Sequence, residues 1–170
     1  MTDAATFLRD TLYPGTKWCE AIPGWNIPFD DRADVLLLAI AGQESGLTAR
    51  VQGGSGPAHG FWQFERAGAV TDVLTHCKTY KLAMVACAAS GVPANPKQAW
   101  GLMATEKGDN LAVAFARLLL WTDQAPLPGL LDDGDAWNFY LGLWRPGKPR
   151  PKDWPGNYQA TLAAVKATPL

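Results

Sequence analysis

The chain has 170 residues, of which 48% are hydrophobic and 18% are charged, a composition typical of one compact domain with an apolar core and incompatible with a disordered chain. The formal net charge of −1 provides no overall field that would attract nucleic acid. The three cysteines form no Cys-x-x-Cys pair, and their odd number argues against a disulfide framework. We therefore expect a single domain over residues 1–170, thiols in a reducing compartment and no nucleic-acid partner.

No segment has the pattern of an export signal or of a membrane span. The N-terminal stretch MTDAATFLRDTLYPG lacks a basic segment followed by an apolar one. No window of about eighteen apolar residues occurs in the sequence. We therefore expect neither a secretory signal nor a membrane span.

Helical patterns dominate the sequence, and no strand pattern of comparable strength occurs. Thr2 or Asp3 can cap a first helix through Leu12, which Pro14 and Gly15 are expected to end. In chain order, further helices are expected over residues 32–45, 66–78, 80–90, 97–105, 111–122, 133–144 and 158–167. This pattern predicts an all-α fold.

Two long segments are expected to be irregular. Residues 13–30 are rich in proline and glycine but also carry several aromatic side chains, and loops of this kind usually pack on themselves or serve a site. Residues 48–64 contain four glycines and a single charged residue, Arg50. A site close to one of these segments is therefore expected.

The helix predicted over residues 32–45, with Asp31 as its cap, is apolar on every side and is expected to run through the middle of the fold. Glu44 lies at its C-terminal end, on a face shared with apolar residues. Desolvation and the partial negative charge of the last carbonyl groups would both raise the pKa of its carboxyl group. Gly46, in a left-handed conformation, would turn the chain away and leave the acid facing a cleft. An acid that stays protonated near neutral pH is what cleavage of a glycosidic bond requires.

This helix alone leaves two interpretations open. Glu44 is either a general acid or an ordinary polar residue at a helix end, paired with Arg50. The motif GFWQF that follows favours the general acid. Gly60 lets the backbone approach a ligand, Trp62 can offer a flat ring face to a sugar, and Gln63 supplies an amide donor and acceptor.

An apolar helix ending in Glu-Ser-Gly, a glycine-rich loop and then Gly-aromatic-aromatic-Gln resemble the lytic transglycosylases and goose-type lysozymes of the lysozyme superfamily. The resemblance is clearest over residues 36–64, and the segment YLGLWRPGKP adds a likeness to the phage-encoded members. It implies that Glu44 is the sole catalytic acid and base and that Ser45 supports its orientation. It also implies that Gly60 and Gln63 contact the substrate.

The sequence departs from the family pattern at two places. Phe61 and Trp62 stand where the family favours Leu-Met, so we expect Trp62 to line the cleft and Phe61 to reshape a sugar subsite. The family's Ala-Tyr-Asn motif corresponds to NFYLG, in which Leu141 replaces the asparagine. The resemblance implies that the hydroxyl group of Tyr140 bonds the catalytic acid.

The resemblance implies an all-α, lysozyme-like domain whose central buried helix ends at the catalytic acid and which cleaves the β-1,4 bond between MurNAc and GlcNAc in peptidoglycan. In the implied transglycosylase reaction, Glu44 protonates the bridging oxygen and the substrate's 2-acetamido group stabilises the oxocarbenium-like centre. Glu44 then takes a proton from the C6 hydroxyl, which closes a 1,6-anhydro ring. No metal, cofactor or protein nucleophile is needed, and Glu65 and Asp72 are expected to be helix caps or first-turn acids.

Two alternative functions stay open. One is a hydrolytic muramidase, in which water replaces the C6 hydroxyl and the same acid acts. The other is an inactive cell-wall-binding or virion structural module. The expected partner is the glycan strand of peptidoglycan, and the expected state is a monomer. The expected location is either the host cytoplasm before release to the periplasm and cell wall, as for an endolysin, or the virion.

The remaining polar residues suggest no further chemistry. His59, His76 and Cys77 match no recognised metal-binding spacing, so no metal site is expected. We expect the side chain of Arg117 to reach solvent, with pairing to a buried acid or a substrate carboxylate as the alternative. The basic segment 145–152 is expected to be solvated and extended, with an anionic cell-wall polymer as an alternative ligand.

Overall fold

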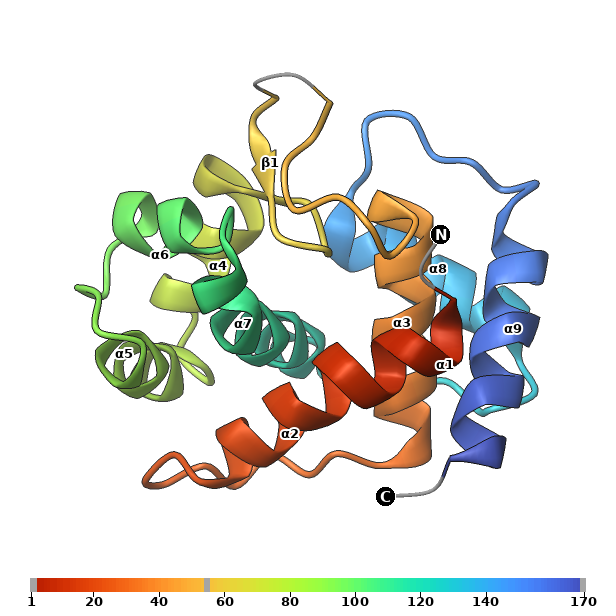
Figure 1. The fold of residues 1–170 in the computed structure, drawn as a ribbon, viewed down its shortest axis with the longest axis horizontal. Coiled ribbons are helices and arrows are strands. Elements are labelled where there is room, and N and C mark those ends of the chain that lie inside the picture. The colour runs from red at the N-terminus through yellow and green to blue at the C-terminus, as the bar shows by residue number, and fades with distance from the viewer. Residues whose placement is uncertain (1–2, 54–55, 169–170) are drawn as a thin grey trace.

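The computed structural model describes residues 3–53 and 56–168, which form a mostly helical chain, as the sequence predicts (Figure 1). These ranges also contain a short two-stranded antiparallel sheet, which the sequence does not predict. Within them, no helix combines the length and the apolar character that crossing a membrane requires.

The N-terminal helical segment is longer than the sequence predicts. It comprises α1 (Ala4–Phe7), the π-helix η1 (Leu8–Leu12) and α2 (Tyr13–Glu20). The expectation that Pro14 and Gly15 end the first helix is wrong, because Pro14 lies in the first turn of α2, where its missing N–H costs no helical hydrogen bond. Gly15 instead lets α2 pack closely on α7 (Asp109–Thr122), since a Cβ atom there would lie 2.5 Å from Cγ2 of Val113.

Helix α3 (Asp31–Ser45) is buried over most of its length and begins one residue before the predicted range. Its cap is Asp30 and not Asp31, because the Asp30 carboxylate accepts a hydrogen bond of 3.0 Å from the backbone N–H of Ala33. Gly46 ends the helix with a φ of 60°, which confirms the predicted left-handed conformation. The chain therefore leaves the helix axis immediately after its last turn.

The segment 48–64 is not irregular throughout. Strands β1 (Ala58–His59) and β2 (Phe64–Glu65) pair antiparallel in a hairpin. The tight turn between them has left-handed residues at both ends, Gly60 with a φ of 73° and Gln63 with a φ of 50°. Two-residue strands leave no alternating pattern of apolar and polar residues, so the sequence did not reveal them.

The helices that follow lie close to their predicted ranges. They are η2 (Arg66–Val70), α4 (Thr71–Thr75), α5 (Tyr80–Ala89), α6 (Pro96–Leu102), α8 (Asp133–Trp144) and α9 (Trp154–Ala167). The short 3-10 helix η3 (Glu106–Gly108) is not predicted by the sequence. The last helix begins at Trp154 instead of the predicted Tyr158, because Pro155 is tolerated in its first turn.

Helix α3 packs against α9, while α7 packs against α2 and α5. Helices α4, α5 and α6 lie on the side of α7 away from α9, as Figure 1 shows. In the same view, the hairpin lies to the left of the C-terminal end of α3, and the segment that joins α8 to α9 arches above that end. The end of α3 is therefore flanked by two connecting segments that come from distant parts of the sequence.

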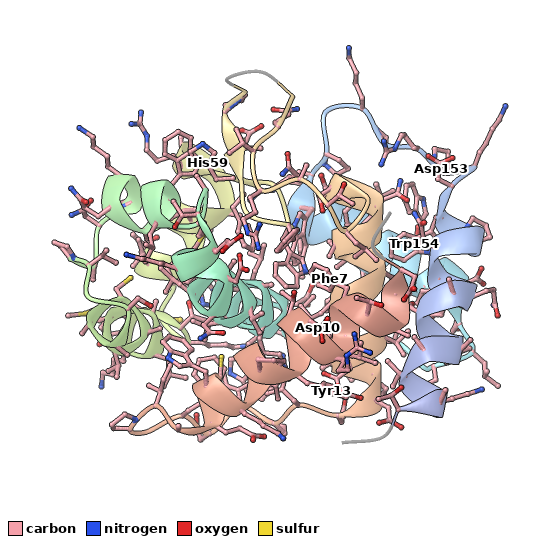
Figure 2. All side chains as sticks on the ribbon, viewed as in Figure 1. Phe7, Asp10, Tyr13, His59, Asp153 and Trp154 are labelled. Carbon is pink, nitrogen blue, oxygen red and sulfur yellow. The ribbon has the colours of Figure 1, made fainter. Side chains whose placement is uncertain are left out.

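Phe7, labelled near the centre of Figure 2, contributes to the packing that holds the hairpin turn in the core. Its ring meets Phe61 edge-on, with 4.8 Å between ring centroids, and Trp62 at 6.1 Å. All three rings are buried. Burial of each large apolar side chain stabilises a fold by about 1.5–3 kcal/mol, so the N-terminal helices contribute directly to the position of the GFWQF motif.

Candidate active site

Glu44, in the last turn of α3, and Tyr140, in α8, meet although 96 positions separate them in the sequence. Oη of Tyr140 donates a hydrogen bond of 2.6 Å to Oε1 of Glu44. The Tyr140 ring is buried and stacks on Trp154 of α9, with 5.4 Å between ring centroids and an interplanar angle of 8°. The packing of three helices therefore fixes the position of the carboxyl group.

The surroundings of Glu44 favour its neutral form. Burial raises the pKa of its carboxyl group above the usual value, and the charge of Glu65 adds to the rise. The hydrogen bond from Tyr140 and the charge of Arg150 act in the opposite direction, but the pKa stays raised. Burial and the neighbouring Glu44 also raise the pKa of Tyr140, so its hydroxyl group remains a donor at neutral pH. This carboxyl group is suited both to give and to take a proton.

Glu44 and Tyr140 line a groove with a volume of about 1060 Å³. Its walls come from the end of α3, the hairpin, η2 with the start of α4, and α8 with the segment that follows it. Its other polar side chains are Gln43, Gln52, Gln63, Glu65, Asp72, Arg145, Lys148 and Arg150. A mixed polar lining of this extent suits a long polar ligand.

Gln63 lines this groove, as predicted, in a fixed orientation. Its Nε2 donates hydrogen bonds to the carbonyl oxygens of Ala49, at 3.2 Å, and Gly60, at 2.9 Å. Because two carbonyl oxygens require a donor, these contacts determine which end of the amide is the nitrogen. The side-chain oxygen is left as the acceptor for an N–H or O–H group of a ligand.

Trp62 does not line the groove, so the expectation that its ring faces a sugar is wrong. The side chain is 0% exposed, and its Nε1 donates a hydrogen bond of 2.9 Å to the carbonyl oxygen of Leu37 in α3. Phe61 is also buried, in contact with Phe7 and with the guanidinium group of Arg50, which lies 4.6 Å from its ring centroid. Both aromatic residues anchor the hairpin turn in the core.

Gly60 and Ser45 serve the fold and do not line the groove. A Cβ atom at Gly60 would lie 3.4 Å from Cβ of Ala112 in α7, so this glycine serves the turn and its packing instead of the approach of a ligand. Oγ of Ser45 donates a hydrogen bond of 2.9 Å to the carbonyl oxygen of Ala41, one helical turn earlier. The hydroxyl group of Ser45 is therefore bonded to the helix backbone and not to the carboxyl group of Glu44.

Arg50 does not neutralise Glu44, which excludes the alternative of an ion pair at the helix end. Its guanidinium group binds both carboxylate oxygens of Asp109, each at 2.8 Å. This bidentate pair ties the segment after α3 to the start of α7. The pKa of Glu44 is thus set by burial, Tyr140 and more distant charges.

Trp144 is the tryptophan that lines the groove, a role the sequence did not suggest. It lies at the end of α8, partly exposed, and its Nε1 donates a hydrogen bond of 3.0 Å to the carbonyl oxygen of Trp62. Its ring also stacks on Phe64, with 6.1 Å between centroids. From helical spacing alone, a tryptophan at this position is indistinguishable from a core residue.

The segment 145–150 also belongs to the groove, although the sequence predicted a solvated connector. All of its residues line the groove wall. The guanidinium group of Arg150 donates to the carbonyl oxygen of Gln43, the residue before Glu44, and Nε2 of Gln43 donates back to the carbonyl oxygen of Arg150 at 3.0 Å. Asn157 of α9 donates a 2.9 Å hydrogen bond to Oε1 of Gln43. The segment is therefore tied to the end of α3.

Two further carboxylates line the groove. Asp72 is paired with Arg145, with 2.6 Å between Oδ2 and Nη2. Glu65 lies on β2 and occupies the predicted N-cap position of η2, but its side chain makes no capping hydrogen bond there. Its exposed carboxylate faces the same groove as Glu44.

The remaining candidates have structural surroundings. Arg117 is 2% exposed and donates from Nε and Nη2 to the carbonyl oxygen of Pro28, so the expectation that it reaches solvent is wrong. Burial lowers its pKa to about 10. His59, labelled on the hairpin in Figure 2, stacks on Trp100 with 3.6 Å between ring centroids. Over residues 3–53 and 56–168, no three His, Cys, Asp or Glu side chains gather in a metal-binding arrangement.

In comparisons with known proteins, no protein-family model, no curated protein and no solved structure matched this chain. The evidence for the candidate site is therefore its own geometry. A buried acid that receives a hydrogen bond from a tyrosine lines a polar groove, and one partly exposed tryptophan is among the described residues that line the same groove.

Proposed function

We propose that this protein cleaves the β-1,4 bond between MurNAc and GlcNAc in peptidoglycan as a lytic transglycosylase, with Glu44 as its single catalytic acid and base. The observation that carries the proposal is the 2.6 Å hydrogen bond from Tyr140 to Glu44 inside the groove. A buried helix that ends at this acid, beside a hairpin, also supports a lysozyme-like architecture. The family resemblance of the sequence over residues 36–64 supports the same proposal.

The carboxyl group has the properties that the first step of this reaction requires. Since Tyr140 donates to Oε1, the acidic proton of neutral Glu44 resides on Oε2. Glu44 transfers this proton to the bridging oxygen as the glycosidic bond breaks, and the substrate's 2-acetamido group stabilises the positive charge at C1. The Tyr140 hydrogen bond then stabilises the carboxylate that remains.

The second step uses the same two residues. The carboxylate of Glu44 takes the proton of the C6 hydroxyl group while the C6 oxygen bonds to C1, which closes the 1,6-anhydro ring and restores neutral Glu44. No second protein group is required for this proton transfer. Gln63 accepts a hydrogen bond from a substrate N–H or O–H group through its free side-chain oxygen, and Trp144 offers an aromatic surface to a sugar ring.

The size of the groove suits a polymeric substrate. Its volume of about 1060 Å³ lies just above the range for small-molecule sites, about 300–1,000 Å³. The groove therefore holds more than one sugar ring, as cleavage between two sugars of a strand requires.

The direct test compares the wild-type protein with Glu44→Gln on purified peptidoglycan. The substitution keeps an acceptor for Tyr140 but removes the acidic proton. We expect the wild-type protein to release soluble fragments and the variant to release none while it still pulls down with insoluble peptidoglycan. A variant that releases fragments at the wild-type rate would exclude Glu44 as the catalyst. A wild-type protein that binds peptidoglycan without releasing fragments would instead indicate a cell-wall-binding module.

Glu65 favours a second candidate function, the hydrolytic muramidase. It is a carboxylate without an ion-pair partner among the described residues, and it lines the same groove as Glu44. Such a group is suited to activate a water molecule in place of the C6 hydroxyl. Glu65→Gln distinguishes the two reactions, because we expect it to abolish hydrolysis and to leave ring closure by Glu44 in place.

A further inference from the structure

The segment 145–150 presents three cations to the groove that contains Glu44. Its sequence is RPGKPR, and no acid occurs from Arg145 to Lys152. Arg145, Lys148 and Arg150 all line the groove and are all exposed. In Figure 1 the segment arches above the C-terminal end of α3, on the way from α8 to α9.

This segment is held in place at both ends. At its start, Arg145 closes α8 in a left-handed conformation, with φ of 47° and its N–H bonded to the carbonyl oxygen of Leu141 at 3.1 Å. At its end, Arg150 and Gln43 exchange hydrogen bonds. Pro146 and Pro149 restrict the backbone between these points. A ligand that binds here therefore meets a wall that is already ordered, which reduces the entropic cost of binding.

The charges of this wall are available to a ligand. Lys148 forms no ion pair with the described residues. Arg150 is 3.3 Å from Asp153 and Arg145 is 2.6 Å from Asp72, but each pair is largely exposed. Exposed pairs contribute only about 0–1 kcal/mol, so a carboxylate of a ligand can replace the protein's own partner.

The sugars of peptidoglycan provide no negative charge for these cations to bind. The lactyl carboxyl group of MurNAc is neutral once it forms an amide with the attached peptide, so the glycan strand itself carries no charge. The carboxylates of the polymer lie on the peptide. Lys and Arg bind carboxylates through charge-assisted hydrogen bonds, which are stronger than those between neutral groups.

We propose that the segment 145–150 binds the acidic peptide attached to MurNAc, with Lys148 as the residue that gives the preference for peptide-bearing strands. The proposal rests on the proposed function, because it assumes that the glycan lies in the groove beside Glu44. Since Arg150 is bonded to Gln43, the residue before Glu44, this wall lies next to the point of cleavage. The peptide of the cleaved MurNAc therefore leaves the groove on the side of the segment.

The test compares two forms of one substrate: purified glycan strands with their peptides, and the same strands after an amidase has removed the peptides. The amidase frees the lactyl carboxyl groups of MurNAc, so these are converted to neutral methyl amides before the comparison. We expect the wild-type protein to cleave the peptide-bearing strands with the higher kcat/KM, by about 10-fold, and this ratio to fall as salt increases. Lys148→Glu is expected to bring the ratio close to one. The matched control is Lys97→Glu in α6, which makes the same change of charge at an exposed position outside the groove and is expected to keep the wild-type ratio.

Several outcomes would overturn the inference. These are equal cleavage of both substrates by the wild-type protein, an equal loss of preference in Lys97→Glu, and a preference that appears only when anionic wall polymers are still attached to the strands.

The inference is also tested without turnover. Glu44→Gln should bind soluble peptide-bearing fragments more tightly than stripped ones, and Lys148→Glu in that background should remove the difference. Failure of the proposed function would leave wild-type cleavage absent or Glu44→Gln active, whereas failure of the inference would leave cleavage intact and the preference absent. The two results are therefore distinguishable.

Discussion

Tyr140 and Glu44 form a hydrogen bond of 2.6 Å that links α8 to the last turn of α3. Tyr140 is the donor, so the bond stabilises the carboxylate form of Glu44 more than the neutral form. Burial has the opposite effect and is the larger of the two. The pair thus holds an acid whose pKa is raised by burial and whose anion is still stabilised by a hydrogen bond.

Tyr140→Phe tests this balance. Loss of the hydrogen bond should raise the pKa of Glu44 further, because the bond lowers it. We expect the alkaline limb of the pH profile of kcat/KM to move to higher pH, and kcat to fall by about 10- to 100-fold as the carboxylate loses its donor. The matched control is Tyr158→Phe in α9, where the hydroxyl group lies 3.5 Å from the carbonyl oxygen of Gly129. A Tyr140→Phe protein with the wild-type profile would exclude a role for this bond.

Glu44→Gln should change the pH dependence of stability. Because the folded-state pKa of Glu44 is raised, its stabilising contribution is present below the unfolded pKa, about 4.3, and is lost as pH rises through the folded value. Glutamine stays neutral throughout. We expect the variant to have a higher Tm than the wild-type protein at pH 8 and a similar Tm at pH 4, as measured by calorimetry. A difference that grows towards low pH would contradict the raised pKa.

Trp62→Phe should reduce stability and leave substrate affinity unchanged. The change removes the buried hydrogen bond to Leu37 and part of the ring volume, which is expected to cost about 1–3 kcal/mol. Trp144→Phe is the contrasting variant, since Trp144 lines the groove. We expect KM for glycan to rise in Trp144→Phe and not in Trp62→Phe. The reverse result would place Trp62 in the substrate site.

Gly15→Ala should destabilise the protein through the contact between α2 and α7. The added methyl group would lie 2.5 Å from Val113, and overpacking of this kind typically costs about 1–3 kcal/mol. Val113→Ala in the same chain removes both γ-carbon atoms but keeps Cβ, 2.7 Å from the added methyl group, so it should recover only part of the loss in a urea titration. Gly101→Ala in α6, where a Cβ atom meets nothing within 4 Å, is the control and should be neutral or stabilising. Equal effects at both glycines would contradict the close packing of α2.

The features that depend on local sequence were predictable. The apolar run before Glu44 gave the range of α3 to within one residue, and the glycine after Ser45 indicated the left-handed end of that helix. The contact between Tyr140 and Glu44 was predicted from the family resemblance and not from local sequence, because no periodicity connects residues 96 positions apart.

The direction of a side chain was the part that the sequence did not show. Both Trp62 and Trp144 are suited to stack on a sugar, but only the tertiary structure decides that the first is buried against α3 and that the second lines the groove. The wall formed by residues 145–150 was missed for a related reason. Its position depends on hydrogen bonds to Gln43, and a proline-rich basic segment gives no sign of them in the sequence.

In the proposed reaction, Glu44 acts as both the acid and the base of a transglycosylase. The measurement that tests it most directly is the mass of the fragment ends released from purified peptidoglycan, with Glu44→Gln as the control. We expect fragments that end in 1,6-anhydro-MurNAc, lighter by one water than the hydrolysis product and resistant to borohydride reduction, and none with the variant. Fragments with reducing MurNAc ends would contradict ring closure, and equal release by Glu44→Gln would contradict the role of Glu44 itself.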